Sequence, residues 1–250
     1  MGDRRVAVVT GAGQGIGAAI AEALAGRGDI VILASRSRDR LESVGARISA
    51  SGGQCEVKTL DLSDPAAIST FGADVVAEWG VPQILVNAAG NAINKPALEV
   101  TPVEWDLIHD VHLRGTFFMC QALGGPMGDA GYGKIINLSS TWASTAKPGR
   151  SVYAAAKAGV SHLTSALAVE WAPRGVRVNA IAPTTTMTPR VAIRVEQDPD
   201  LERAIGEQIP LGRMATVEDV TNAAVFLASP ESDFITGHTL YVDGGFQHAK

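Results

Sequence analysis

Short runs of apolar and β-branched residues alternate along this chain with longer amphipathic stretches. The short runs predict β-strands over residues 6–10, 30–35, 54–60, 84–87, 134–138, 177–182 and 239–242. The longer stretches predict helices over residues 15–26, 38–50, 64–79, 102–122 and 151–172, and a last helix that opens at Thr216. Ser63 is the expected N-cap of the helix over 64–79, because a serine hydroxyl can accept from free N–H groups in the first turn.

Strands that alternate with helices build right-handed β-α-β units, whose strands lie parallel in one sheet. The predicted strands are apolar along nearly their whole length, which is typical of a sheet buried on both faces. No linker, repeat or low-complexity segment divides the chain. We therefore expect an α/β fold with a doubly wound, Rossmann-type sheet of seven parallel strands, helices on both faces, and a single domain over residues 1–250.

Residues 184–215 are the longest stretch without a regular period. Pro189, Pro199 and Pro210 do not fit one continuous helix. Long loops in compact domains are often functional, and many act as lids over active sites. We expect this segment to be a substrate loop or lid within the single domain.

A glycine-rich loop, TGAGQGIG, occupies residues 10–17 between the first predicted strand and the first predicted helix. Its glycines allow a tight turn and let backbone N–H groups approach a pyrophosphate, while the helix N-terminus favours the anion. The alternative is a glycine-rich turn without a ligand. The placement after a strand and before a helix is typical of a dinucleotide site, so the loop predicts that the protein binds NAD(P)(H).

The loop reads TGxxxGxG rather than the common GxGxxG. Further along are NAAG at residues 87–90, a tyrosine at 153 with a lysine at 157, and YVDGG at residues 241–245. With these motifs in this order, nearly the whole chain resembles the short-chain dehydrogenase/reductase family, in particular its branch of 3-oxoacyl-acyl-carrier-protein reductase-like and glucose dehydrogenase-like enzymes. The resemblance implies an oxidoreductase that moves a hydride between a nicotinamide and a carbonyl or secondary alcohol.

The resemblance also implies which residues bind the cofactor. Asp61 is expected to contact adenine, Asn87 to brace the loop after the fourth strand, and Thr186 and Thr188 to contact the nicotinamide carboxamide. Thr184 stands where the family usually has glycine, which leaves the backbone angles of that turn open. The full expected set is Gly11, Gln14, Gly15, Ile16, Gly17, Ser35, Arg36, Asp61, Leu62, Asn87, Ala88, Ala89, Gly90, Tyr153, Lys157, Pro183, Thr186 and Thr188.

The choice between NADP(H) and NAD(H) is expected at the end of the second strand. An acidic residue there would bind the ribose hydroxyls and repel a 2′-phosphate. This chain has Ser35 and Arg36, followed by Arg38 and Arg40, and a guanidinium pairs well with phosphate. Gln14 argues the other way, because NADP(H)-preferring relatives often have a basic residue there. We favour NADP(H), with NAD(H) as the alternative.

Tyr153 and Lys157 lie four residues apart, on one face of a predicted helix. Hydride transfer to a ketone leaves an alkoxide that must be protonated. A nearby ammonium lowers the pKa of a phenol, which makes the phenol a better acid–base catalyst. In the family the catalytic serine precedes the tyrosine by 13 positions, which implies Ser140 as the donor to the substrate oxygen, whereas Ser139 is expected to be structural.

The sequence departs from its family at His112, where members usually carry a catalytic asparagine. The stretch around it is locally similar to the (3R)-hydroxyacyl-CoA dehydrogenase domain of peroxisomal multifunctional enzymes. His112 either joins a proton relay, since histidine titrates near neutral pH, or only packs where the asparagine would be. His109 and His112 lack acidic or thiolate companions at ligand spacing, so we expect no metal site.

Composition and charge limit the kinds of partner that we expect this protein to bind. The formal net charge is −5 and no basic block stands out, which argues against a nucleic-acid partner. The apolar run near the start, 6–9, is too short for a signal peptide, and no run is long enough to cross a bilayer. Cys55 and Cys120 form no metal or disulfide motif. We expect a cytoplasmic protein without membrane contact.

The substrate is a small carbonyl or alcohol compound, and its pocket is expected at residues 91–96, 141–150 and 184–194. Lys95, Arg150, Arg190 and Arg194 would hold an anionic group there, or are solvated. Two alternatives stay open: an NAD(H)-dependent (3R)-hydroxyacyl-thioester dehydrogenase, and a redox sensor that binds a dinucleotide without turnover. By analogy with the family, the helices over 102–122 and 151–172 contact partner subunits in a homotetramer, with a dimer as the alternative.

Overall fold

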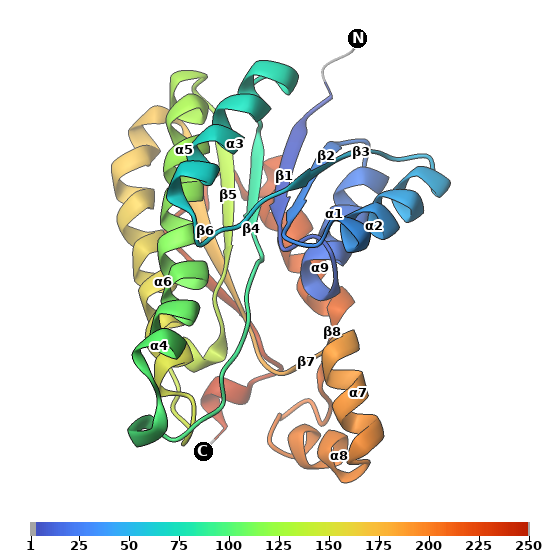
Figure 1. Cartoon of the computed structure of the whole chain (residues 1–250), viewed down its shortest axis with the longest axis vertical. Helices are drawn as coiled ribbons and strands as arrows, with labels where there is room; N and C mark the ends of the chain where they lie inside the picture. The colour runs from blue at the N-terminus through green and yellow to red at the C-terminus, as the bar shows by residue number, and fades with distance from the viewer. Residues whose placement is uncertain (1–3, 250) are drawn as a thin grey trace.

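The computed structural model describes residues 4–249, so the ends of the predicted 1–250 domain lie outside the described residues. Within this range the chain forms one seven-stranded sheet in the order β3-β2-β1-β4-β5-β6-β9 (Figure 1). All of its neighbouring strands are parallel. The strands are β1 (Val6–Thr10), β2 (Ile30–Ser35), β3 (Gln54–Thr59), β4 (Ile84–Asn87), β5 (Gly133–Leu138), β6 (Val176–Pro183) and β9 (Thr239–Val242). The predicted doubly wound sheet is confirmed.

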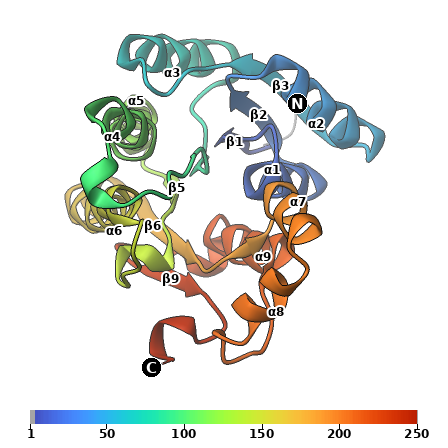
Figure 2. The same ribbon diagram turned by 60° about the horizontal axis from the view of Figure 1, so that its bottom comes forward.

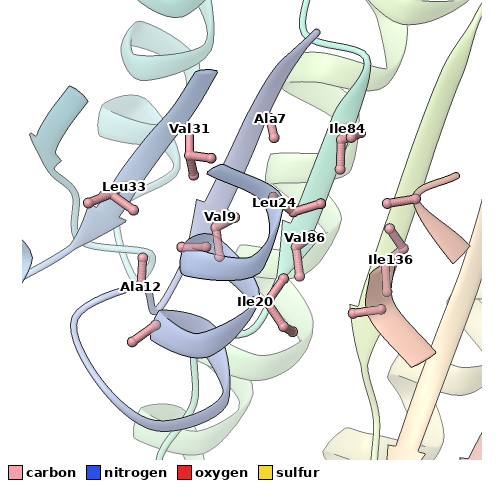
Figure 3. Packing of buried hydrophobic residues seen from close by; sticks show 14 of the residues in the cluster. Ala7, Val9, Ala12, Ile20, Leu24, Val31, Leu33, Ile84, Val86 and Ile136 are labelled. Atoms are coloured by element: carbon pink, nitrogen blue, oxygen red, sulfur yellow. The ribbon is translucent and has the colours of Figure 1, made fainter. Parts of the chain in front are cut away.

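Two hydrophobic clusters hold helices against the two faces of the sheet. On one face pack α1 (Gly15–Gly26), α2 (Arg38–Ala50) and α9 (Val217–Leu227). Figure 3 shows Ile20 and Leu24 of α1 against Val9 and neighbouring strand residues. On the other face pack α3 (Pro65–Trp79), α5 (Gly115–Asp129) and α6 (Ser151–Trp171). Successive β1 residues join opposite clusters, as the two-residue period of a strand requires.

The strand order reverses between β1 and β4, and ligands of doubly wound sheets bind at such a switch point. The carboxyl ends of the strands share the lower edge of the sheet in Figure 1. Beside this edge stand α7 (Pro189–Gln197) and α8 (Asp200–Gly206) (Figure 2). In chain order the two helices lie between the short paired strands β7 (Thr186–Met187) and β8 (Ala215–Thr216). Half of the segment over 184–215 is therefore helical. Pro189 begins α7, Pro199 lies between the two helices, and Pro210 follows α8.

The structure corrects two predicted helices. Asp64, not Ser63, caps α3, because its carboxylate accepts from the N–H groups of Ala66 and Ala67. The helix predicted over 102–122 is α4 (Pro102–His109), a π-helical turn (Asp110–Arg114) and α5, which ends at Asp129. Hydrophobic period alone does not reveal a π-turn, which adds one residue to a helix. The last helix begins after Thr216 as predicted, and Thr216 and Asp219 form a capping box at the start of α9.

Short 3₁₀ turns complete the described chain, at Ala97–Glu99, Thr141–Ala143, Ala172–Arg174, Pro230–Ser232 and Phe246–His248. No helix within residues 4–249 has the length and apolar character needed to cross a membrane. In the same range, no cluster of three or more histidine, cysteine or acidic side chains is arranged to hold a metal ion. Cys55 and Cys120 are free thiols, and only Cys120 is fully buried.

Candidate active site

The carboxyl edge of the sheet is hollowed by two adjoining cavities. The first, of about 370 Å³, is lined by the glycine loop, the end of β2 and the residues after β3. The second, of about 340 Å³, is lined by the ends of β5 and β6 and the first turns of α6 and α7. Both are lined by Ile16, Ala88, Ala89, Gly90 and Asn91, so they form one continuous cleft. An elongated ligand with two ends fits such a cleft.

The cleft brings together nearly all the residues predicted from the sequence. The first cavity is lined by Gly11, Gln14, Gly15, Ile16, Gly17, Ser35, Arg36, Asp61, Leu62, Ala88, Ala89, Gly90 and Thr188. The second is lined by Tyr153, Lys157, Pro183 and Thr186, together with Ser140 and His112. Of the predicted residues, all of which lie in the described range, Asn87 alone lines neither cavity.

The glycine loop owes its shape to one close backbone approach. Gly11 has a φ of +68°, and a Cβ on it would lie 2.6 Å from the Cα of Ala89 after β4. Only glycine allows the turn after β1 to press against the turn after β4 in this way. The loop therefore packs closely on the turn after β4 and lines the first cavity, where a pyrophosphate would meet the N-terminus of α1.

The far end of the first cavity carries the residues expected to choose the cofactor. Arg36 is exposed and lines the cavity. Arg40, on α2, also lines it and donates from Nη1 to Oε1 of Gln14 at 2.8 Å. Gln14 therefore brings a guanidinium to the corner where relatives often carry a basic residue in the loop. Sequence reasoning noted Arg40 but missed this contact, because Gln14 and Arg40 are 26 positions apart.

Asp61 is held as an acceptor beside Arg36. The backbone N–H and the hydroxyl of Ser63 donate to its Oδ1 at 2.9 and 2.8 Å. These two hydrogen bonds, with a smaller contribution from Arg36, lower the pKa of Asp61. The carboxylate is therefore ionised and ready to accept from an amino group.

Asn87 differs from its expected role as a brace for the following loop. Its Nδ2 donates to Oδ1 of Asn137 on β5 at 2.9 Å, and Nδ2 of Asn137 donates to the Thr164 hydroxyl on α6 at 3.0 Å. The Asn87 side chain points across the sheet because alternate strand residues face opposite sides. Asn87 therefore ties α6 to the sheet beneath the active site.

Ser140, Tyr153 and Lys157 meet in the second cavity. The Lys157 ammonium lies 5.8 Å from the centre of the Tyr153 ring and donates to the Leu138 carbonyl at the end of β5. Ser140 follows the same strand, and its Oγ accepts from the Trp142 N–H at 3.2 Å. Ser139 is engaged elsewhere, with its hydroxyl 2.6 Å from that of Ser161.

Burial sets the protonation of these groups. It raises the pKa of Tyr153, an effect that Ser140 and Arg150 oppose. It lowers the pKa of Lys157 to about 7, because the ammonium loses its hydration. Negative charge on a bound ligand would favour the charged form of Lys157, whereas hydrogen-bond donors or positive charge beside the phenol would favour the phenolate of Tyr153.

His112 lies in the π-turn, buried between Gly90 and Tyr153. Its ring meets the Tyr153 ring edge to face, with centroids 5.3 Å apart. Nε2 is 2.7 Å from the carbonyl oxygen of Asn91 and 3.1 Å from its backbone N–H, so it can donate to the first or accept from the second, and Nδ1 has no partner among the described residues. Burial, with repulsion from Lys157, lowers the pKa of His112 to about 3, so the imidazole is neutral near pH 7.

The turn after β6 tolerates the threonine at 184. All described residues with positive φ are glycines, so Thr184 has an ordinary backbone conformation. Its carbonyl accepts from the Thr186 hydroxyl at 3.0 Å. Thr188 caps α7 by accepting from Val191, which leaves its hydroxyl hydrogen free to donate into the cleft.

The structure also adds residues that the sequence did not single out as cofactor contacts. Gly13, Asn91 and Val111 line the first cavity. The sequence could have indicated Gly13 and Asn91 as cofactor contacts, because each is next to a predicted motif residue in the chain. Val111 is recognisable only once the π-turn carries it to the cleft.

A Rossmann-type sheet, a phosphate-accepting glycine loop and a serine–tyrosine–lysine cluster in one cleft define a dinucleotide-dependent oxidoreductase. Comparison with known proteins refines this class. A family model described as enoyl-(acyl carrier protein) reductase matches residues 11–247. The chain belongs to the short-chain dehydrogenase/reductase family, whose members act on CH–OH groups with NAD(P).

Its relatives cover most of the chain. A D-threitol dehydrogenase of Mycolicibacterium smegmatis is 39% identical over 98% of this chain and 93% of its own. A 3-oxoacyl-[acyl-carrier-protein] reductase of Escherichia coli is 37% identical over 96% of each chain. The crystal structure of a gluconate 5-dehydrogenase from Burkholderia cenocepacia, in complex with NADP and tartrate, matches with a TM-score of 0.93 and 32% identity, over 98% of this chain and 96% of that chain.

The low pKa of His112 generates a testable prediction. Because its imidazole is neutral across pH 5–8, His112→Asn should keep most of the activity and leave the dependence of kcat on pH unchanged in that range. His109→Asn is the matched control, since His109 is half-buried on α4 and lines neither cavity. If the variant lost an ionisation between about pH 5 and 8 that the wild type shows, His112 would be a relay group instead.

Proposed function

We propose that this protein transfers a hydride between NADP(H) and a carbonyl or secondary alcohol by a Ser140–Tyr153–Lys157 mechanism. The observation that carries the proposal is the meeting of these three side chains in a cavity continuous with the one at the glycine loop. The cofactor set predicted from the sequence, without Asn87, is proposed to line the dinucleotide.

The bound nicotinamide supplies the hydride in reduction, or accepts it in oxidation. In reduction, Ser140 donates a hydrogen bond to the substrate oxygen. Tyr153 transfers its proton to the same oxygen as the C–H bond forms, and the resulting phenolate is stabilised by the Lys157 ammonium. Solvent then reprotonates Tyr153. Oxidation runs through the same groups in reverse, with the phenolate as base.

Burial alone disfavours the phenolate of Tyr153, and the ammonium of Lys157 offsets that effect. A buried Tyr153 holds its proton tightly, and Lys157 is charged in only part of the population near its pKa of about 7. Each group stabilises the charged form of the other, because a phenolate and an ammonium attract strongly in a site with little water. The pair therefore works as one acid–base unit.

The proposed preference for NADP(H) is supported by two guanidiniums. Arg36 and Arg40 line the first cavity beside the position of a ribose 2′-phosphate, and Gln14 holds Arg40 there. The related gluconate 5-dehydrogenase structure contains NADP. Ser35 offers a hydroxyl where NAD(H)-dependent enzymes of this fold present a carboxylate.

An acyl-thioester dehydrogenase or reductase is the second candidate. It is favoured by the 37% identity to the Escherichia coli 3-oxoacyl-[acyl-carrier-protein] reductase. A redox sensor without turnover has less support, because a sensor has no need of a serine, a tyrosine and a lysine assembled in the cleft.

We also propose that copies of the chain pair through α4, α5 and α6, in a homotetramer. These helices lie side by side on one flank of the molecule (Figure 1) and expose apolar side chains, with Val103 of α4 76% exposed and Val169 of α6 80% exposed. Exposed apolar side chains gathered on neighbouring elements are typical of subunit interfaces.

Tyr153→Phe tests the mechanism. The change removes the transferable proton and keeps the ring, so kcat/KM on the best ketone of a panel should fall by about 10²-fold or more. NADPH binding, measured by calorimetry, should be unchanged. Tyr132→Phe is the control, because Tyr132 stands before β5 at the opposite edge of the sheet. A Tyr153→Phe enzyme that keeps most of its activity would refute the mechanism.

Arg36→Ala and Arg40→Ala test the cofactor preference. Each removes a charge-assisted contact to the 2′-phosphate, so each should weaken NADPH binding by about tenfold or more and barely affect NADH. Arg38→Ala is the matched control, because Arg38 pairs with Glu42 and does not line the cavity. Equal losses for both nucleotides, or tighter binding of NADH by the wild type, would contradict the preference.

The subunit interface is tested by sedimentation velocity. The wild type should sediment as a tetramer, and a Val103→Lys, Val169→Lys double variant should form a smaller species, because buried ammonium groups oppose association. Ser49→Lys adds a charge on exposed α2 and should leave the assembly intact. A double variant that sediments like the wild type would exclude this surface.

A further inference from the structure

Three arginines surround the second cavity close to the catalytic groups. Arg150 lies directly before α6, one helical turn from Tyr153, while Arg190 and Arg194 lie four residues apart on α7. Among the described residues that line this cavity, none is acidic. The cavity therefore has a positive lining with no carboxylate to balance it.

The three guanidiniums have no ion-pair partner among the described residues. Lys95, which the sequence placed with them, differs because Glu104 holds it at 3.0 Å and it does not line the cavity. Partial burial lowers the pKa of Arg150, and the charges of Arg194 and Arg190 lower it further. Positive groups that repel one another in this way are stabilised when an anion binds between them.

Arg150 is held in a defined place. Its guanidinium lies 5.9 Å from the centre of the Trp142 ring, and the Trp142 N–H donates to Ser140. The ring of Phe246 meets Trp142 from another side, with centroids 5.8 Å apart. Packing over an aromatic ring restrains a guanidinium, and its N–H groups remain able to bind an anion at two atoms. Arg150 therefore lies beside the place where Ser140 and Tyr153 are proposed to bind the substrate oxygen.

Arg190 and Arg194 lie on a helix whose residues are at most half-buried. No residue of α7 is fully buried, so few packing contacts hold this helix in place. Both arginines are exposed. An anion on Arg150 would draw the two side chains, and with them α7, over the cleft, which is how a mobile segment completes a site around its ligand.

Resting on the proposed function, we propose that the substrate is a small hydroxy or keto acid whose carboxylate is bound by Arg150 and enclosed by Arg190 and Arg194. The relatives differ in the charge of the compounds that their names give. D-threitol is neutral, whereas gluconate is an acid and the structure named for it also holds tartrate. The arginines of this chain favour the acid. A planar carboxylate matches the two-pronged geometry of a guanidinium.

Matched substrate pairs test the proposal, with NADP⁺ as cofactor. Gluconate and D-glucitol, and threonate and D-threitol, differ only by a carboxylate in place of a hydroxymethyl group. Each acid should be oxidised with a kcat/KM about tenfold or more above its polyol, the ratio expected of one charge-assisted contact. Added NaCl should raise KM for the acids and leave kcat unchanged, because salt screens an exposed ion pair.

Arg150→Met assigns the preference to one side chain. The acid-to-polyol ratio of kcat/KM should fall by about tenfold or more, and Arg150→Lys should restore part of it through charge alone. Arg203→Met is the matched control, because Arg203 lies on α8, paired with Asp200 and Glu207. Calorimetry measures binding without turnover. Tartrate should bind the NADP⁺-loaded wild type and should bind the Arg150→Met variant more weakly.

The outcomes separate the two proposals. If polyols are oxidised as well as acids, or Arg150→Met lowers both equally, the carboxylate site is refuted while Tyr153-dependent turnover still supports the oxidoreductase. If no alcohol or ketone is turned over, the proposed function fails, and tartrate binding that depends on Arg150 still supports the anion site. Glycerol phosphate that binds more tightly than tartrate would overturn the carboxylate in favour of a phosphate.

Discussion

A buried chain of hydrogen bonds between β4, β5 and α6 is the constraint on which the active site depends. Asn87 donates to Asn137, Asn137 donates to Thr164, and the Thr164 hydroxyl donates to the Val160 carbonyl. Each of these three side chains is at most 4% exposed, and removing one leaves its partner unsatisfied, which costs about 1–3 kcal/mol. This chain fixes α6, and with it Tyr153 and Lys157, against the strand ends.

The parallel sheet supplies the other half of the site. Because its strands all end at one edge, the turn after β1, the residues after β4 and the end of β5 meet there. The glycine loop leaves room for an anion only because Gly11 packs on the backbone of Ala89. The same edge carries α7 and α8 on short strands, and α7, which has no fully buried residue, lines the cleft beside the buried strand ends.

Much of this arrangement follows from the sequence, because strand and helix periods are local and the motif residues lie at strand ends or, for Tyr153 and Lys157, on one face of a single helix. The rest depends on contacts between distant residues. Nothing local indicates that Asn87 turns toward Asn137, or that Gln14 holds Arg40. The helices over 189–206 were missed because their prolines break the period. The neutral state of His112 arises from burial by Gly90 and Tyr153, which no pattern around residue 112 contains.

The buried Lys157 lowers the stability of the folded protein while serving the proposed catalysis. Burial lowers its pKa from 10.5 to about 7, whereas the unfolded chain keeps the proton up to about pH 10.5. Between these values the unfolded state binds more protons, so the free energy of unfolding rises with pH, and below about pH 7 the full cost of burying the ammonium is present. A laboratory selection for heat resistance alone would thus favour an apolar side chain at this position. It would enrich more stable proteins that lack the ammonium proposed for catalysis.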